Sequence, residues 1–159
     1  MKFLLPSILS LFISVNVAAQ TPAPTIPDFT FFKFNKTAFT NKDITAGKIL
    51  FFVFFDTECD HCRHGIQYLN QHQKELAKAA VYLISMDSQE KIAGFLSKYG
   101  NNLTGKKNIL LLQDIKNEFI LRFSPRKYPS LFLYSLQKKL ILYDDDENNL
   151  YKFLEKIKT

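Results

Sequence analysis

The feature that most constrains the fold of this chain is an apolar run that ends at two cysteines and is followed by an amphipathic stretch. The run covers residues 49–55, is rich in aromatic and β-branched side chains, and is apolar at nearly every position. Such a run is typical of a strand buried on both faces inside an α/β sheet, and it is too short to cross a membrane. Four later side chains share one helical face: Ile66, Leu69, Gln73 and Leu76. We therefore expect a strand, a turn and a helix, with Cys59 and Cys62 in the first turn of that helix.

A thiol at the start of a helix is a candidate nucleophile. The unpaired N–H groups there and the positive end of the macrodipole favour an anion, so a thiol at that point loses its proton more easily. Cys59 is therefore the predicted thiolate. Of the two residues between the cysteines, His61 would favour the thiolate when protonated or donating a hydrogen bond, whereas Asp60 would disfavour it. Because these effects oppose each other, the direction of electron flow stays open.

The remaining pattern predicts one α/β domain over residues 29–159. Further strands are expected around Phe29 and Phe31 and at residues 81–86, 109–112, 131–134 and 140–143. Further helices are expected after Ser88, after Asp114 and at the C-terminus. The helix after Asp114 is expected to carry Ile115, Phe119, Ile120 and Phe123 on one face. We interpret the acidic run at residues 144–147 as solvated. The C-terminal helix is expected to cover the face of the sheet opposite the first helix.

The N-terminus has the pattern of a secretory signal peptide. Lys2 precedes an apolar run at residues 3–15, and the small residues Val17-Ala18-Ala19 follow, which predicts a signal over residues 1–19. The alternative, an uncleaved anchor, is disfavoured because the run is shorter than the roughly 20 residues that a membrane helix needs. Residues 20–28 are proline-rich and predict an extended lead-in where nothing compact forms. We expect an exported protein, in the bacterial periplasm or outside the cell, without a stable membrane span after cleavage.

Charge and cysteine content narrow the function classes. The chain has 21 Lys and Arg against 15 Asp and Glu, with a formal net charge of +6. The lysines are spread at spacings that suit solvated faces, so we expect no nucleic-acid partner. Outside the cytosol thiols can stay oxidised, and the two cysteines of the chain form one candidate dithiol.

A CxxC motif at a strand-to-helix junction within a βαβ pattern is a recognised redox signature. With Cys59-Asp60-His61-Cys62 at that junction and Tyr128-Pro129 before the later strand pair, the chain resembles the thioredoxin superfamily, most closely exported proteins of the TlpA/redoxin type. The resemblance implies a central mixed β-sheet flanked by helices on both faces, and a thiol–disulfide oxidoreductase that needs no cofactor or metal. Its partners would be protein thiols and disulfides, including a partner that recycles the dithiol. It also implies a cis Pro129 facing the dithiol, with the backbone of Tyr128 binding an extended substrate beside the basic rim of Arg126 and Lys127.

The chain departs from the thioredoxin pattern near the cysteines. Val53 occupies the position where thioredoxins place a buried carboxylate that takes a proton from the resolving cysteine, and Phe55 and Glu58 stand where thioredoxins carry tryptophans. Deprotonation of Cys62 would then use water or a neighbour such as Asp56 or Glu58. We therefore expect a slow general reductase that works best on a dedicated partner.

Other interpretations of the two cysteines are weaker. A purely structural disulfide between Cys59 and Cys62 would close a very short loop and would therefore restrict the unfolded chain little. A metal site built on Cys59, His61, Cys62 and His64, with copper as the most suitable ion, lacks a second ligand pair. A peroxidase of the peroxiredoxin type would resemble PxxxTxxC, but Phe52 and Asp56 hold the proline and threonine positions. The main alternative is a non-catalytic thioredoxin-like module that binds a metal or a partner.

Overall fold

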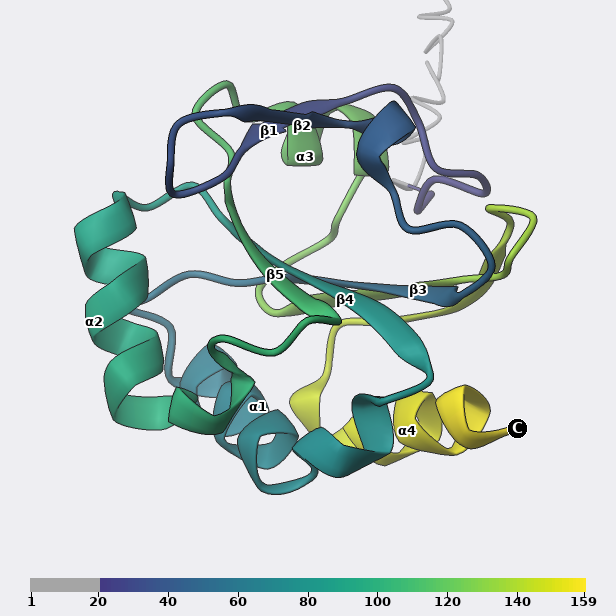
Figure 1. Cartoon of the computed structure of the whole chain (residues 1–159). Coiled ribbons are helices and arrows are strands. Elements are labelled where there is room, and N and C mark those ends of the chain that lie inside the picture. Colours follow the sequence, from purple (N-terminus) through teal and green to yellow (C-terminus); the bar gives the residue numbers. More distant parts are fainter. Residues whose placement is uncertain (1–20) are drawn as a thin grey trace, which may run out of the picture.

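A seven-stranded mixed sheet runs through the computed structural model, which describes residues 21–159 (Figure 1). The strands are β1 (Thr30–Phe32), β2 (Ala38–Thr40), β3 (Ile49–Phe54), β4 (Ala79–Ser85), β5 (Ile109–Gln113), β6 (Ser130–Tyr134) and β7 (Leu140–Asp144), and their order across the sheet is β2-β1-β5-β4-β3-β6-β7. Strand β3 lies between β4, its parallel neighbour, and β6, its antiparallel neighbour. The predicted interior strand is therefore confirmed. The predicted signal peptide, residues 1–19, lies outside the described residues.

In the part of the chain that the structure describes, four α-helices connect and cover the strands. They are α1 (Asp60–Gln71), α2 (Gln89–Tyr99), α3 (Glu118–Phe123) and α4 (Leu150–Lys158). Helix α1 begins directly after Cys59, as the sequence predicts. Helix α2 begins after Ser88, whose hydroxyl accepts a hydrogen bond from the N–H of Lys91 at 3.3 Å. The βαβ unit formed by β3, α1 and β4 therefore places the two cysteines at the end of a central strand.

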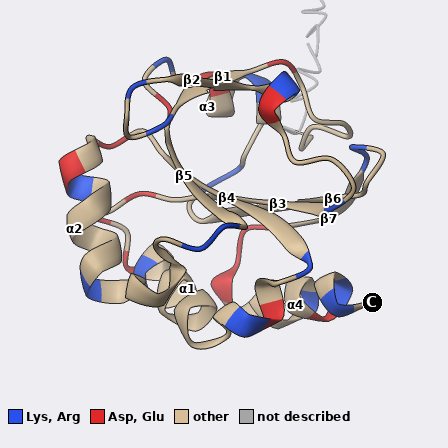
Figure 2. Ribbon diagram, viewed as in Figure 1, with Lys and Arg blue, Asp and Glu red and all other residues tan. Residues whose placement is uncertain are grey.

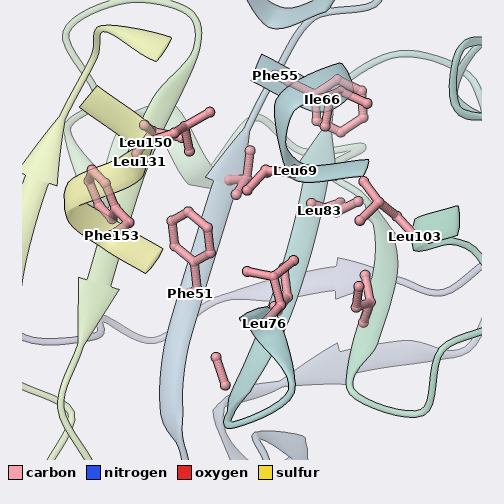
Figure 3. Close-up of a cluster of buried hydrophobic side chains, with 14 of the residues drawn as sticks. Phe51, Phe55, Ile66, Leu69, Leu76, Leu83, Leu103, Leu131, Leu150 and Phe153 are labelled. Atoms are coloured by element: carbon pink, nitrogen blue, oxygen red, sulfur yellow. The ribbon is translucent and has the colours of Figure 1, made fainter. Parts of the chain in front are cut away.

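One face of the sheet is covered by α1, α2 and α4 (Figure 1). Its core mixes aliphatic and aromatic side chains, including Phe51 and Leu83 from the strands, Leu69 from α1 and Phe153 from α4 (Figure 3). The expectation that α4 covers the opposite face is therefore wrong. Helix α4 packs beside α1 near Gly65, where a Cβ would lie at an ordinary van der Waals distance of 3.5 Å from a methyl group of Leu150.

The opposite face carries α3 and the β1–β2 hairpin over a core dominated by aromatic rings (Figure 1). Phe119 on α3 stacks on Phe54 of β3 with ring centroids 4.4 Å apart. The buried carboxylate of Asp114 accepts hydrogen bonds from the N–H groups of Glu118 at 3.0 Å and Phe119 at 2.8 Å, and these bonds support the start of α3. Since the helix begins only at Glu118, the expected helical position of Ile115 is wrong, and that side chain is exposed.

The proline-rich lead-in packs against the domain. Ala23 and Ile26 are buried, the N–H of Ala23 donates to the carbonyl of Phe123 at 3.0 Å, and Thr25 forms an isolated β-bridge with Lys139. The expectation that nothing compact forms there is wrong for residues 21–28, although the segment is extended. Proline lacks an N–H, but the residues between the prolines still pair their backbone with the edge of the sheet.

Charged side chains lie away from the central strands, which are tan in Figure 2. The strands β3, β4, β5 and β6 contain no Asp, Glu, Lys or Arg, in agreement with their burial between two covered faces. Within residues 21–159, no helix is long and apolar enough to cross a membrane.

Candidate active site

Cys59 is the N-cap residue of α1. Its backbone is extended, and its sulfur accepts a hydrogen bond from the N–H of Cys62 at 3.2 Å. The sulfur thus takes the place that a hydroxyl or carboxylate oxygen usually takes at a helix start. Both cysteines are free thiols, and Cys59 is partly exposed. A substrate sulfur can therefore reach Cys59.

Cys62 lies one turn further into the same helix and has a different environment. Its side chain is 1% exposed and belongs to the core cluster under α1. Burial raises the pKa of the Cys62 thiol well above its usual range, although a backbone hydrogen bond from Asp56 opposes this effect. Val53, 2% exposed, belongs to the same cluster and pairs in register with Leu83 and Leu131. The position beside the buried thiol is therefore apolar.

The turn that carries Cys59 is held by carboxylates. Asp56 accepts a hydrogen bond from the N–H of Glu58 at 2.7 Å. Asp87, at the end of β4, accepts from both the N–H and the hydroxyl of Thr57, at 2.9 and 2.8 Å. Partial burial raises the pKa of Asp87, but the hydrogen bonds from Thr57 and Ser85 outweigh it and the net pKa is lowered. Asp87 therefore holds in place the segment between β3 and Cys59. The sequence analysis missed this role because Thr57 and Asp87 follow two different strands.

Tyr128 and Pro129 directly precede β6, and the peptide bond between them is cis. The ring of Tyr128 lies 4.9 Å from that of Phe54 and contacts the core clusters on both faces of the sheet, the one that contains Cys62 included. Burial raises the pKa of Tyr128 to about 12, so its phenol is neutral at physiological pH. The resemblance predicts that Tyr128, Pro129 and the two cysteines share one site, and Tyr128 packs against the core cluster that contains Cys62.

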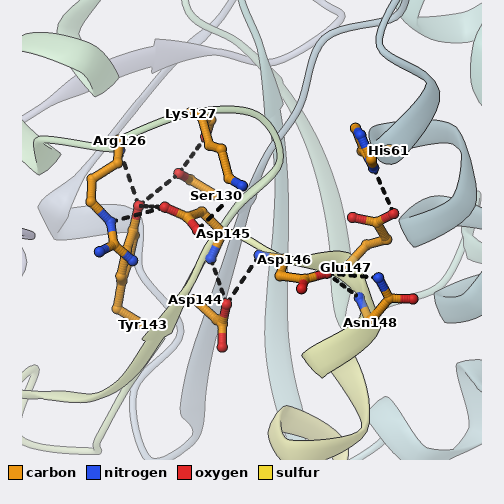
Figure 4. Close-up of polar contacts among 10 residues, drawn as sticks. All are labelled: His61, Arg126, Lys127, Ser130, Tyr143, Asp144, Asp145, Asp146, Glu147 and Asn148. Atoms are coloured by element: carbon orange, nitrogen blue, oxygen red, sulfur yellow. Dashed lines mark hydrogen bonds and ion pairs between the residues drawn. The ribbon is translucent and has the colours of Figure 1, made fainter.

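The acidic run at residues 144–147 is not simply solvated, which corrects the sequence interpretation (Figure 4). Asp145 forms ion pairs with Arg126 at 2.9 Å and with Lys127 at 3.8 Å, just before Tyr128. Glu147, with its side chain 11% exposed, contacts Nδ1 of His61 at 2.8 Å. One short segment therefore contacts both the loop before Pro129 and one of the two residues between the cysteines.

The other charged side chains near Cys59 have partners of their own. Asp60 pairs with Arg63 at 3.0 Å within α1, and Glu58 pairs with Lys91 on α2 at 2.7 Å. The side chain of His61 is 71% exposed and contacts Glu147. The carboxylates that the sequence analysis considered as proton acceptors, Asp56 and Glu58, are thus engaged by a backbone N–H and by a lysine.

Two histidines of this part of the chain, His61 and His72, contact carboxylates. Besides His61, His72 contacts Glu75 through Nδ1 at 2.7 Å. Across residues 21–159, no group of three or more His, Cys, Asp or Glu side chains converges in a way that could hold a metal ion.

The fold and the position of the CxxC motif define a thioredoxin-like protein. The chain belongs to the AhpC/TSA family, whose model matches residues 22–143. No curated protein sequence is significantly similar to it. The predicted relationship to redoxins, and the thioredoxin-like fold with helices on both faces of a mixed sheet, are confirmed.

Solved structures with this fold are similar in architecture and distant in sequence. The thioredoxin domain of a thiol-disulfide oxidoreductase from Bacteroides vulgatus is 18% identical with a TM-score of 0.67, covering 89% of this chain and 100% of that one. A domain of a possible thiol-disulfide isomerase from Cytophaga hutchinsonii is 22% identical with a TM-score of 0.68, covering 87% of this chain and 94% of that one. At these identities the similarity shows the fold alone.

Proposed function

We propose that this protein is an exported thiol–disulfide oxidoreductase that acts on protein disulfides or dithiols through Cys59 and Cys62. The observation that carries the proposal is the contrast within the motif: a partly exposed sulfur at the start of α1 and a buried thiol one turn deeper. The proposed compartment, outside the cytoplasm, rests on the signal pattern in the sequence, and an oxidising compartment suits a dithiol that alternates between two states.

The proposed reaction is two successive thiol–disulfide exchanges. The Cys59 thiolate attacks one sulfur of a substrate disulfide, a mixed disulfide forms, and the other substrate sulfur leaves as a thiolate that takes a proton. Cys62 then loses its proton and attacks the Cys59 sulfur, which releases the second substrate thiolate and leaves a Cys59–Cys62 disulfide. Two electrons pass from the dithiol to the substrate, and the reverse sequence oxidises a partner dithiol.

The surroundings of Cys62 support the proposal that Cys62 resolves the mixed disulfide slowly when the substrate is not a dedicated partner. Val53 cannot accept a proton, so the proton of Cys62 must leave through water or through groups at the edge of the site. The backbone around the cis bond of Tyr128–Pro129 is the proposed binding strip for an extended substrate segment, and Asp60 and His61 are the proposed residues that tune the dithiol. A bound partner that excludes bulk water and aligns the mixed disulfide would favour resolution by Cys62.

Trapping with Cys62→Ser tests the proposal. In this variant the exchange should stop at the mixed disulfide, so partners should accumulate as adducts on Cys59 that dithiothreitol releases, and the identity of the partner would give the direction of electron flow. Cys59→Ser is the matched control and should trap nothing. Hydrogen peroxide consumption and metal content after purification without chelator should both stay at background. Equal trapping by the two variants would contradict the assignment, and stoichiometric copper would favour the binding module.

A further inference from the structure

A hollow lies beside the proposed substrate strip, on the side away from α1. It has a volume of about 260 Å³ and is lined by Phe54, Ile120, Pro125, Arg126, Lys127 and Tyr128. Its walls are mostly apolar, and Ile120 of α3 is 37% exposed there although it is a large apolar residue. A volume of this size accommodates one large apolar side chain.

Tyr128 connects this hollow to the dithiol. Its ring forms one wall of the hollow, where it packs on Phe54, and it also contacts the core cluster that contains Cys62. The hollow therefore adjoins the backbone of Tyr128, which is the proposed binding strip for a substrate segment. A side chain of that segment, close to the reacting sulfur in sequence, can enter it.

The rim of the hollow has an excess of positive charge. Arg126 and Lys127 share one carboxylate, that of Asp145, at 2.9 and 3.8 Å (Figure 4). The guanidinium of Arg126 also lies over the ring of Tyr143, 4.8 Å from its centroid, which restricts its orientation. One carboxylate balances one of the two cations, and both side chains are more than half exposed. The rim can therefore attract a further anionic group.

We infer that the hollow selects the substrate: it receives one large apolar side chain of an extended protein segment that carries the reacting sulfur, and Arg126 and Lys127 bind a carboxylate next to that side chain. The inference rests on the proposed function and specifies the partner as a protein with an apolar and an acidic residue close to its reactive cysteine. Ile120, Arg126 and Lys127 are specificity-determining residues and take no part in the exchange of sulfur bonds.

The test uses short synthetic peptides, each containing one cysteine and supplied as a symmetrical disulfide. Near the cysteine they carry Leu with Asp, Leu with Lys, Ser with Asp, or Ser with Lys. The reduced Cys62→Ser protein forms the mixed disulfide with one peptide and releases the other as a thiol, which quenched-flow chromatography quantifies. We expect the peptide with Leu and Asp to react roughly tenfold faster than the peptide with Ser and Lys, with contributions from apolar burial and from charge.

Variants separate the two contributions. Ile120→Ser should remove the advantage of Leu over Ser, whereas Leu121→Ser, at a neighbouring residue that is 75% exposed and does not line the hollow, should leave it. The double variant Arg126→Gln/Lys127→Gln should remove the preference for Asp over Lys, and Lys116→Gln should not. Asp145→Asn leaves both cations without their carboxylate, so it should strengthen the preference for Asp.

Equal rates for all the peptides, or preferences that persist in these variants, would overturn the inference. The small disulfide 5,5′-dithiobis(2-nitrobenzoate) distinguishes this result from failure of the proposed function. If it reacts at Cys59 while the peptides show no preference, the proposed oxidoreductase activity is supported and the selection by the hollow is wrong. If neither this reagent nor any peptide reacts, both the proposed function and the selection by the hollow are wrong. Sedimentation of wild type and Ile120→Ser tests whether a second copy of the chain occupies the hollow. We expect both proteins to be monomers, and a dimer that is lost in the variant would also overturn the inference.

Discussion

Cys59 and Cys62 belong to the same helical turn, yet the fold gives them opposite surroundings. Cys59 sits at the N-cap, partly exposed, with a backbone N–H directed at its sulfur. Cys62 is 1% exposed among the side chains under α1, and burial raises the pKa of its thiol. The difference teaches that position in the helix sets the surroundings of each sulfur. In the proposed reaction, the sulfur at the surface attacks the substrate, and the buried sulfur, whose thiol stays protonated, resolves the mixed disulfide.

The largest expected difference between the two cysteines is in their rate of alkylation. With reduced protein at mildly acidic pH, iodoacetamide should label Cys59 roughly a thousandfold faster than Cys62, because thiolate character and exposure control cysteine reactivity. Peptide mapping by mass spectrometry over a time course gives both rates. Urea-unfolded protein, in which the two sites should react alike, is the control. Equal labelling of the folded protein, or faster labelling of Cys62, would reverse the assignment of the nucleophile.

The apolar environment of Cys62 can be broken at Val53. Val53→Asp should lower the free energy of unfolding by a few kcal/mol at neutral pH, because a buried carboxylate without a partner is costly. It should also change the turnover of insulin disulfides, because it offers Cys62 an internal proton acceptor.

Val53→Asn is the matched control, polar and similar in size but unable to ionise. Denaturation by urea should show that the two variants differ in stability above about pH 4, where the aspartate of the unfolded chain ionises, and converge below it. In the insulin assay, the double variant Asp56→Asn/Glu58→Gln tests whether these carboxylates assist Cys62. Wild-type turnover as fast as that of an ordinary thioredoxin, unchanged in all three variants, would contradict the idea that the missing carboxylate limits the reaction.

The raised pKa of Cys62 predicts a pH dependence of stability in the reduced protein. The folded state holds this proton more tightly than the unfolded state, so the contribution is fully present below the unfolded pKa of about 8.5 and is lost as the pH rises above it. We expect the free energy of unfolding to fall by up to about 1.4 kcal/mol per pH unit between pH 8.5 and 10. Cys62→Ala should show a flatter profile in urea titrations, and parallel profiles would refute the prediction.

The smallest expected effect concerns the contact of Glu147 with His61, which lies between the two cysteines. Glu147→Gln should change the free energy of unfolding by less than about 1 kcal/mol, since His61 is largely exposed and exposed ion pairs contribute little. If His61 tunes the dithiol, as we propose, Glu147→Gln and His61→Asn should each shift the reduction potential, and the double variant should shift it by less than the sum. Glu155→Gln, on the exposed side of α4, is the control. Additive shifts would show that Glu147 does not act through His61.

Local sequence determined the part of the site that one strand and one helix build. The apolar run at residues 49–55 specified a strand buried on both faces, and the spacing of Ile66 and Leu69 specified the helix, so the position of both cysteines at its start followed from periodicity alone. The same holds for α2, where Ser88 caps the helix through a contact within a few residues.

Tertiary structure decided everything that depends on contacts between distant segments. The side of the sheet that α4 covers follows from its packing with α1 in one core cluster, and no pattern within α4 encodes which face that is. The acidic run at residues 144–147 has the composition of a solvated loop, and only the return of β7 beside the loop before Tyr128 gives Asp145 and Glu147 their partners. Hydrophobic periodicity shows which side chains are buried, but it does not show which charged groups meet, because ion pairs depend on the arrangement of whole elements in space.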